Sequence, residues 1–193
     1  MSACQIDFLR VAASSNYVII PILQGTAPYR MIPVTVLCIS QLVLAINPRV
    51  AANNVQELIN LAKSQPGKLS FASAGVGTTP YMAGELFKLN IRQDIVHIPY
   101  KGAGPSITAL VGGQVPMAFT SVSAVVPFIQ DGRLRALATT GEKRTSALPN
   151  VPTFVEAGFP DVVVDQWNAI FVPSSTPGVV SLFVSPAISH ANL

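Results

Sequence analysis

Two glycines, Gly75 and Gly77, lie in the segment Ser73-Ala74-Gly75-Val76-Gly77-Thr78-Thr79, between an apolar stretch and an amphipathic one. A glycine-bearing turn from a strand into a helix leaves unpaired backbone N–H groups, and these groups and the helix dipole favour an anion. The hydroxyls of Ser73, Thr78 and Thr79 add donors suited to carboxylate oxygens. The segment therefore predicts an anion site. The alternative is a tight turn whose glycines only satisfy backbone geometry.

The same segment does not match the common nucleotide-binding motifs. No lysine follows Gly77, which excludes a Walker phosphate loop, and Gly75-Val76-Gly77 lacks the third glycine of a dinucleotide fingerprint. We predict no cofactor.

Three further polar segments are candidates for the same site. Tyr100-Lys101-Gly102 and Thr120-Ser121 each follow an expected strand, and ligands of open α/β sheets bind beyond the carboxyl ends of strands. Lys101 is equally well explained as a solvated loop lysine, and the hydroxyl residues as helix caps. Ser14-Ser15-Asn16 has the same ambiguity.

Catalytic and metal-binding residues find little support. His97 alternates with apolar residues on an expected strand, as a structural histidine does, and His190 lies in a segment without a clear pattern. There is no G-x-S-x-G motif, and the acidic residues form no pair suited to acid–base chemistry. Cys4 and Cys38 are too few for a disulfide framework, and no Cys/His spacing suits zinc. We predict neither a catalytic nor a metal site.

Composition narrows the class of protein. Charged residues are only 11% of the 193 residues against 50% hydrophobic ones, and the net charge of +3 comes from scattered basic residues. A nucleic-acid interface needs clustered basic residues with aromatics, so none is expected. The apolar stretch 32–46 is shorter than the ~20 residues of a membrane-spanning helix and predicts a buried strand. The N-terminus shows no export signal.

The elements that position these residues alternate between strand and helix, which indicates an α/β fold. Expected strands cover 34–46, 69–72, 95–99, 115–119, 134–139, 162–164 and 170–172. Expected helices begin after Asn54, in a capping box with Glu57, and after Thr79 as N-cap with Pro80 at the first helical position. Others cover 105–111, 122–129 with Pro127 as a kink or an end, and a short stretch at 154–157.

Four stretches in order carry a family resemblance: PGKLSFASAGVGTTPYMAGELFK (66–88), VHIPYKGAGPSITALVGGQV (96–115), GRLRALATTGEKRTSALPNVPTFVEAGFP (132–160) and WNAIFVPSSTP (167–177). They closely resemble the Bug-type solute receptors, the extracytoplasmic substrate-binding proteins of tripartite tricarboxylate transporters. The resemblance runs from about residue 47 to 177, and more faintly back to residue 14.

The resemblance implies a periplasmic-binding-protein type II fold whose two α/β lobes close over a small carboxylate ligand. It implies no enzyme activity, a periplasmic location and delivery of the ligand to membrane permease subunits. Residues 47–166 would form a nearly complete second lobe, and 1–46 with 167–193 a partial first lobe. The implied ligand-binding residues are Ser14, Ser15, Asn16, Ser73, Ala74, Gly75, Gly77, Thr78, Thr79, Tyr100, Lys101, Gly102, Thr120 and Ser121.

Several departures from the family pattern qualify this expectation. The signal peptide and first glycine-rich loop of the family are not present, and the segment 178–193 is apolar and unlike the family. Thr120 stands where many members carry Asp, which argues against an α-amino ligand. The sequence therefore predicts a shortened receptor with strand faces open to water. A non-functional receptor remnant and the effector-binding domain of a transcription regulator are the alternatives.

Overall fold

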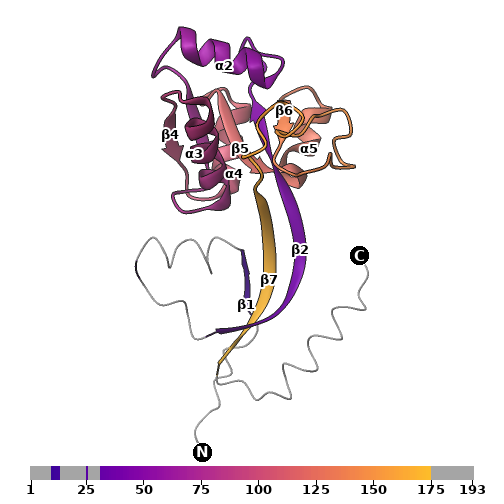
Figure 1. Ribbon diagram of the computed structural model, residues 1–193. Coiled ribbons are helices and arrows are strands. Elements are labelled where there is room, and N and C mark those ends of the chain that lie inside the picture. The colour runs from indigo at the N-terminus through magenta and orange to yellow at the C-terminus, as the bar shows by residue number, and fades with distance from the viewer. Residues whose placement is uncertain (1–9, 14–24, 26–30, 175–193) are drawn as a thin grey trace, which may run out of the picture. The chain divides into compact units, whose positions relative to one another are not determined.

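The computed structural model describes residues 10–13, 25 and 31–174. The chain divides into two compact units: unit 1 is Met1–Ile39 with Trp167–Leu193, and unit 2 is Ser40–Gln166. Two strands, β2 (Met31–Ile46) and β7 (Asp165–Pro173), contribute residues to both units (Figure 1).

In unit 1, strand β1 (Arg10–Ala13) pairs antiparallel with β7, with Arg10 opposite Phe171 and Ala13 opposite Asn168. Large apolar side chains of β2 are exposed here: Ile32 by 43%, Val36 by 52%, Leu37 by 43% and Ile39 by 68%. Because even and odd positions of a strand point to opposite faces, apolar side chains on both faces of this part of β2 are open to water. The prediction that 32–46 is a buried strand is therefore wrong for its first part and confirmed only for 42–46.

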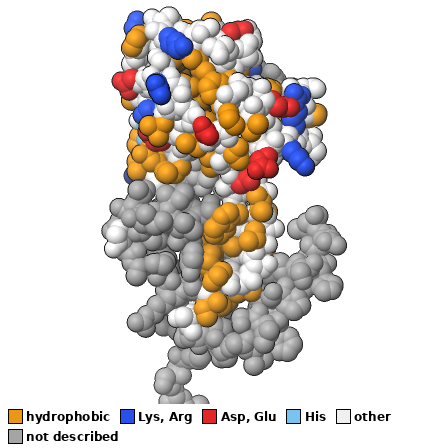
Figure 2. Space-filling model, viewed as in Figure 1, with side chains coloured by type: hydrophobic (Ala, Val, Ile, Leu, Met, Phe, Trp, Pro, Cys, Tyr) orange, Lys and Arg blue, Asp and Glu red, His pale blue; other side chains and the backbone are white. Residues whose placement is uncertain are grey.

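Charge is unevenly distributed between the two units. Within residues 31–174, every Lys, Arg, Asp and Glu falls between Ser40 and Gln166. Figure 2 shows side chains of both signs interspersed on the visible face of this part, without a large basic patch.

Unit 2 is built on a mixed sheet with the strand order β6-β2-β5-β3-β4. Strand β3 (Ser70–Ser73) runs parallel to both of its neighbours, β4 (Val96–Pro99) and β5 (Met117–Ser121). Strand β2 is antiparallel to β5 and to β6 (Arg135–Thr139). The mixed α/β class predicted from the sequence is confirmed.

Four helices cover the two faces of this sheet: α2 (Val55–Ser64), α3 (Thr79–Ile91), α4 (Ala103–Val111) and α5 (Val122–Gln130). Alternate strand residues face opposite ways and build two separate cores. One core joins α2 and α3 to the sheet, and the other joins α4 and α5 to its opposite face. Fully buried members include Leu44, Phe71, Phe119, Leu58 and Phe87 in the first core, and Val43, Ala72, Ala118, Leu110 and Val125 in the second.

Several predicted boundaries needed correction. The N-cap of α3 is Thr78 and not Thr79, because Thr78 is extended and its Oγ1 accepts the N–H of Tyr81. Helix α5 continues beyond Pro127 to Gln130, since the proline carbonyl still accepts the N–H of Asp131. Thr120 and Ser121 do not follow β5 but are its last two residues.

The chain after β6 contains neither the short helix expected at 154–157 nor the strand expected at 162–164. A turn replaces the helix, because Gly158 takes a left-handed φ of 89° and the N–H of Phe159 returns to the carbonyl of Phe154 at 2.8 Å. The first turn nevertheless has a reciprocal cap, in which Glu156 N–H donates to Thr153 Oγ1 and Thr153 N–H to Glu156 Oε2.

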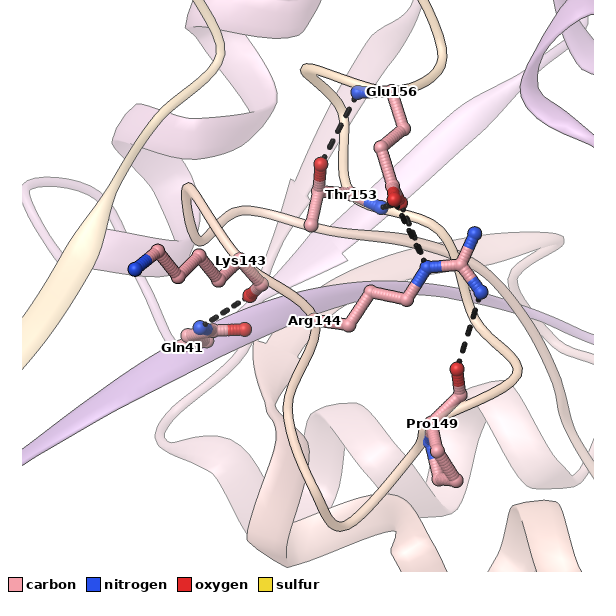
Figure 3. A network of polar contacts seen from close by, with 6 residues as sticks. All are labelled: Gln41, Lys143, Arg144, Pro149, Thr153 and Glu156. Carbon is pink, nitrogen blue, oxygen red and sulfur yellow. Dashed lines mark hydrogen bonds and ion pairs between the residues drawn. The ribbon is translucent and has the colours of Figure 1, made fainter.

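Figure 3 shows how this segment is held in unit 2. Arg144 Nε lies 2.9 Å from Glu156 Oε2, and a terminal nitrogen of Arg144 donates to the carbonyl of Pro149 at 3.2 Å. Gln41 of β2 donates to the carbonyl of Lys143 at 2.9 Å. The ion pair is exposed, so its main effect is to fix the loop geometry.

Among the described residues, no helix combines the length and the apolar character that crossing a membrane requires.

Candidate functional site

Three helices of unit 2 begin at the same edge of its sheet. Because β3, β4 and β5 are parallel, their last residues, Ser73, Pro99 and Ser121, lie at one edge, which we call the carboxyl edge. Helices α3, α4 and α5 follow these strands, and none has an acidic residue in its first turn. Three helix dipoles thus present their positive ends there, and the exposed Lys101 lies between β4 and α4.

The loop from β3 into α3 requires glycine at Gly75. This residue has φ 129°, and a Cβ there would lie 3.3 Å from the carbonyl oxygen of Tyr100. The loop therefore packs its backbone directly against the end of β4. Two hydrogen bonds fix the contact, from Tyr100 N–H to the Ser73 carbonyl and from Gly102 N–H to the Ala74 carbonyl, both at 3.1 Å.

This contact brings together two of the predicted site segments, 73–79 and 100–102. The sequence predicted that both segments lie beyond the carboxyl ends of the strands, and the structure places their backbones in direct contact.

Thr78 closes the loop and begins the helix. Its hydroxyl donates to the Gly75 carbonyl at 2.7 Å and accepts the N–H of Tyr81, and its own N–H also reaches the Gly75 carbonyl. By contrast, in the part of the chain that the structure describes, the N–H groups of Val76 and Gly77 donate to no protein acceptor. Gly77 is buried, and a buried N–H is nearly always paired with a protein, water or ligand oxygen.

The remaining predicted residues are placed less closely. Thr120 is 3% exposed and lies opposite Val43, on the sheet face that packs α4 and α5. Ser121, one residue on, shares the opposite face with Phe119 and takes the N-cap position of α5 without a side-chain capping bond. Only Ser121 is therefore on the same face as Ser73. Ser14, Ser15 and Asn16 lie outside the described residues.

Ser73 is fully buried and has a partner that the sequence did not reveal. Its Oγ lies 2.8 Å from Nε2 of His97 and accepts the N–H of Gly75 at 3.1 Å. We therefore place Ser73 beneath the loop, as its support. The signal was present in the sequence, since Ser73 ends β3 and His97 lies on the parallel neighbour β4, but only the strand register brings the two together.

The imidazole of His97 lies between two aromatic rings. Its ring centre is 4.8 Å from that of Phe71 and 4.7 Å from that of Tyr81. Burial lowers the pKa of His97 below its usual 6.5, with Glu85 opposing this shift and Lys88 adding to it. Glu85 and Lys88 form an ion pair on α3, with Nζ and Oε2 3.2 Å apart.

This arrangement suits binding of an anion. The described residues contain no group of three His, Cys, Asp or Glu side chains placed to hold a metal ion. Ser73 resembles a nucleophile beside a histidine, yet its side chain has no exposed surface from which to meet a substrate.

Comparison with known proteins defines the class first. A solved periplasmic transporter superposes with a TM-score of 0.90 at 34% identity, covering 95% of this chain and 63% of that one. Malate-bound MatC of Rhodopseudomonas palustris (TM-score 0.85, 27% identity) matches 95% of this chain and 64% of its own. Adipate-bound Rpa4515 of R. palustris (0.85, 26%) matches 93% and 62%. The fold is that of a periplasmic binding protein.

The family follows from the sequence match. Residues 9–191 match the tripartite tricarboxylate transporter family receptor, and the chain belongs to this family. The match extends through nearly all of the segment 178–193, so the prediction that this segment is unlike the family is wrong. The protein BugT of Bordetella pertussis is 34% identical over 173 residues, which are 88% of this chain and 53% of BugT. The chain thus spans about half the length of this curated relative.

Proposed function

We propose that this chain is a solute receptor that binds a small carboxylate at the carboxyl edge of unit 2 without cofactor or catalysis. One observation carries the proposal: three helices without acidic residues in their first turns begin at one edge, where Gly77 is buried with an unpaired N–H. A carboxylate is the ligand that such donors and dipoles favour.

The ligand chemistry of relatives supports a dicarboxylate. MatC was solved with malate and Rpa4515 with adipate, and both are similar to this chain over more than nine-tenths of its length. We propose that unit 2 corresponds to one lobe of such receptors, and that the residues of unit 1 belong to the other lobe.

Delivery to permease subunits and a periplasmic location complete the proposal. They rest on membership of the receptor family and on relatives described as periplasmic. Because the chain spans about half of its curated relatives, these roles belong to the proposal for this chain.

The test is a nuclear magnetic resonance titration of the ¹⁵N-labelled chain, which detects millimolar binding residue by residue. Malate, adipate and citrate are the probes, and the neutral diamide of adipate is the matched control for shape without charge. We expect at least one carboxylate to shift the amide signals of residues 75–79 and 102–104 saturably. The amides of the first turn of α2 should not move, because Glu57 already occupies that position.

Two results would overturn the proposal. One is no saturable shift at residues 75–79 up to about 10 mM of every carboxylate, a concentration that corresponds to about 2.7 kcal/mol of binding free energy. The other is an equal response to the neutral diamide, which would show that charge is not what the site recognises.

A further inference from the structure

Ser73, which is fully buried, and its partly buried partner His97 connect the sheet to the candidate carboxylate loop. Ser73 Oγ has three polar neighbours: Nε2 of His97 at 2.8 Å, the N–H of Gly75 at 3.1 Å and the carbonyl of Gly75 at 3.3 Å. The Gly75 N–H is a donor, so the single Ser73 proton goes either to His97 or to the Gly75 carbonyl.

The count of donors decides between the two acceptors. The Gly75 carbonyl already accepts the Thr78 hydroxyl at 2.7 Å and the Thr78 N–H at 3.3 Å. A carbonyl oxygen has two lone pairs, so both are taken. From this count we infer that the Ser73 hydroxyl donates to Nε2 of His97, its nearest polar neighbour, and not to the Gly75 carbonyl, which would place the ring proton of His97 on Nδ1.

Burial lowers the pKa of His97 below 6.5, which favours the neutral ring at pH 7, and a neutral imidazole has one nitrogen that can accept a hydrogen bond. Four groups thus form a chain from β4 to the N-cap of α3: His97, Ser73, Gly75 and Thr78.

We propose that His97 is a positioning residue for carboxylate binding. Its Nε2 holds the Ser73 proton, which aims the Ser73 oxygen at the Gly75 N–H and leaves the Gly75 carbonyl to Thr78. The Gly75–Val76 peptide, which carries the unpaired N–H of Val76, is thereby fixed, and the unpaired N–H of Gly77 lies in the next peptide. This role rests on the proposed carboxylate site.

The first test reads the tautomer directly and does not depend on ligand. In the unliganded ¹⁵N-labelled protein at neutral pH, we expect His97 to show the Nδ1-protonated tautomer, with Nε2 as an unprotonated acceptor. A proton on Nε2 would overturn the proposal, because His97 would then donate to Ser73.

The second test is a double-mutant cycle on carboxylate affinity with Ser73→Ala and His97→Phe. Phenylalanine keeps a ring between Phe71 and Tyr81 but removes the acceptor nitrogen. If His97 acts through Ser73, each variant should weaken binding about tenfold, the scale of one lost hydrogen bond, and the double variant no further. His97→Gln, whose amide oxygen can accept the same proton, should restore most of the affinity.

The outcomes separate this inference from the proposed function. Suppose that the wild type binds a carboxylate. If the affinity losses of Ser73→Ala and His97→Phe then add in the double variant, or if His97→Phe keeps full affinity, the role of His97 is overturned and the carboxylate site stands. No wild-type binding defeats the proposed function and this role together, while the tautomer still reports whether the hydrogen bond exists. If His97→Phe does not fold, Ser73→Ala with His97→Leu carries the cycle, because leucine also removes the acceptor nitrogen and its loss of affinity should not add to that of Ser73→Ala.

Discussion

Helices begin at both edges of the sheet in unit 2, and the two edges differ in negative charge. The first turn of α2 carries an acidic side chain, whereas the first turn of α3 carries none. Helix α2 follows β2, whose last residue, Ile46, lies opposite the first residue of β5, so α2 begins beyond the other edge from α3. At its start, Asn54 accepts the Glu57 N–H at 2.8 Å, and Glu57 accepts the N–H of Asn53 at 2.8 Å. Helix α3 begins with a neutral Thr78 cap and no acidic residue.

The difference shows what turns a helix start into a candidate site. At α2 the chain supplies its own carboxylate, and the Asn53 N–H lowers the pKa of Glu57 below its usual 4.5. At α3 the hydroxyl cap satisfies the Tyr81 N–H but brings no charge, and the N–H groups of Val76 and Gly77 stay unpaired in the described structure. The dipole is common to both helices, so the absence of an internal anion is what distinguishes α3.

The strongest way to break this comparison is to give α3 a carboxylate of its own. Thr78→Asp keeps a good N-cap residue, so the helix should form, but it removes the hydroxyl that donates to the Gly75 carbonyl and places a negative charge beside the position of the ligand carboxylate. Two such charges about 5 Å apart repel by ~3 kcal/mol at an effective dielectric constant of 20, which weakens binding about a hundredfold. Calorimetric titration with the carboxylate identified above measures the loss.

Thr108→Asp is the matched control, because it adds the same charge at an exposed position within α4. It should change affinity by less than about threefold, which is under 0.7 kcal/mol. Equal losses in the two variants would show that net charge, and not the α3 start, governs binding.

The second prediction concerns the backbone that shapes the α3 start. Gly75→Ala forces a side chain into φ 129° and against the Tyr100 carbonyl, so it should destabilise the protein by about 1–3 kcal/mol. Gly104→Ala is the control, since that glycine is helical and has nothing within 4 Å of an added Cβ. It should be neutral or stabilise by up to ~1 kcal/mol in urea unfolding. Equal stability of the two variants would contradict the close approach of the loop to β4.

Much of this edge was predictable from sequence because its signals are local. The glycines, the hydroxyl cap and the Pro80 helix start lie within eight residues, and the Asn54–Glu57 capping box predicted α2 correctly. The Ser73–His97 bond was not predictable, because the two residues are 24 apart in the sequence and only the register of β3 and β4 brings them together. The helix predicted at 154–157 is wrong. The capping pattern that suggested it does form, with Glu156 N–H bonded to Thr153, but the left-handed φ of Gly158 ends the turn before a helix can continue.

The third prediction sharpens the comparison from the α2 side. Asn54→Ala removes the cap that accepts the Glu57 N–H and should cost about 1 kcal/mol of stability, whereas Asn54→Asp keeps an acceptor and should cost little. Neither variant should alter carboxylate affinity, because α2 begins at the other edge. Urea unfolding together with the ligand titration tests both statements. If Asn54→Ala is fully folded under the titration conditions and still binds the carboxylate more weakly than wild type, the two edges are coupled.

The smallest expected effect is that the two edges respond to acid in different pH ranges. Burial lowers the pKa of His97 below 6.5, so between pH 6.5 and the lower folded value the unfolded chain binds a proton that the folded chain refuses. The stability that neutral His97 contributes at the α3 edge is therefore fully present above pH 6.5 and decreases as the pH falls below 6.5. Hydrogen bonding lowers the pKa of Glu57 below 4.5, so the α2 edge keeps its contribution above pH 4.5 and loses it only as the pH falls through the folded value.

Urea unfolding of wild type, His97→Phe and Glu57→Gln between about pH 7.5 and pH 3.5 resolves the two ranges. His97→Phe loses the Ser73 bond at every pH, but the gap to wild type should narrow as the pH falls below 6.5, since only wild type has the histidine proton to take up. The narrowing should stay well below the ~1.4 kcal/mol of a full pKa unit, because solvent screens the partly exposed ring of His97. Glu57→Gln should differ from wild type in stability by a constant amount above pH 4.5, and the difference should shrink only below pH 4.5. A constant gap for His97→Phe throughout would mean that the imidazole is as easily protonated in the fold as in the unfolded chain, which would contradict the lowered pKa of His97.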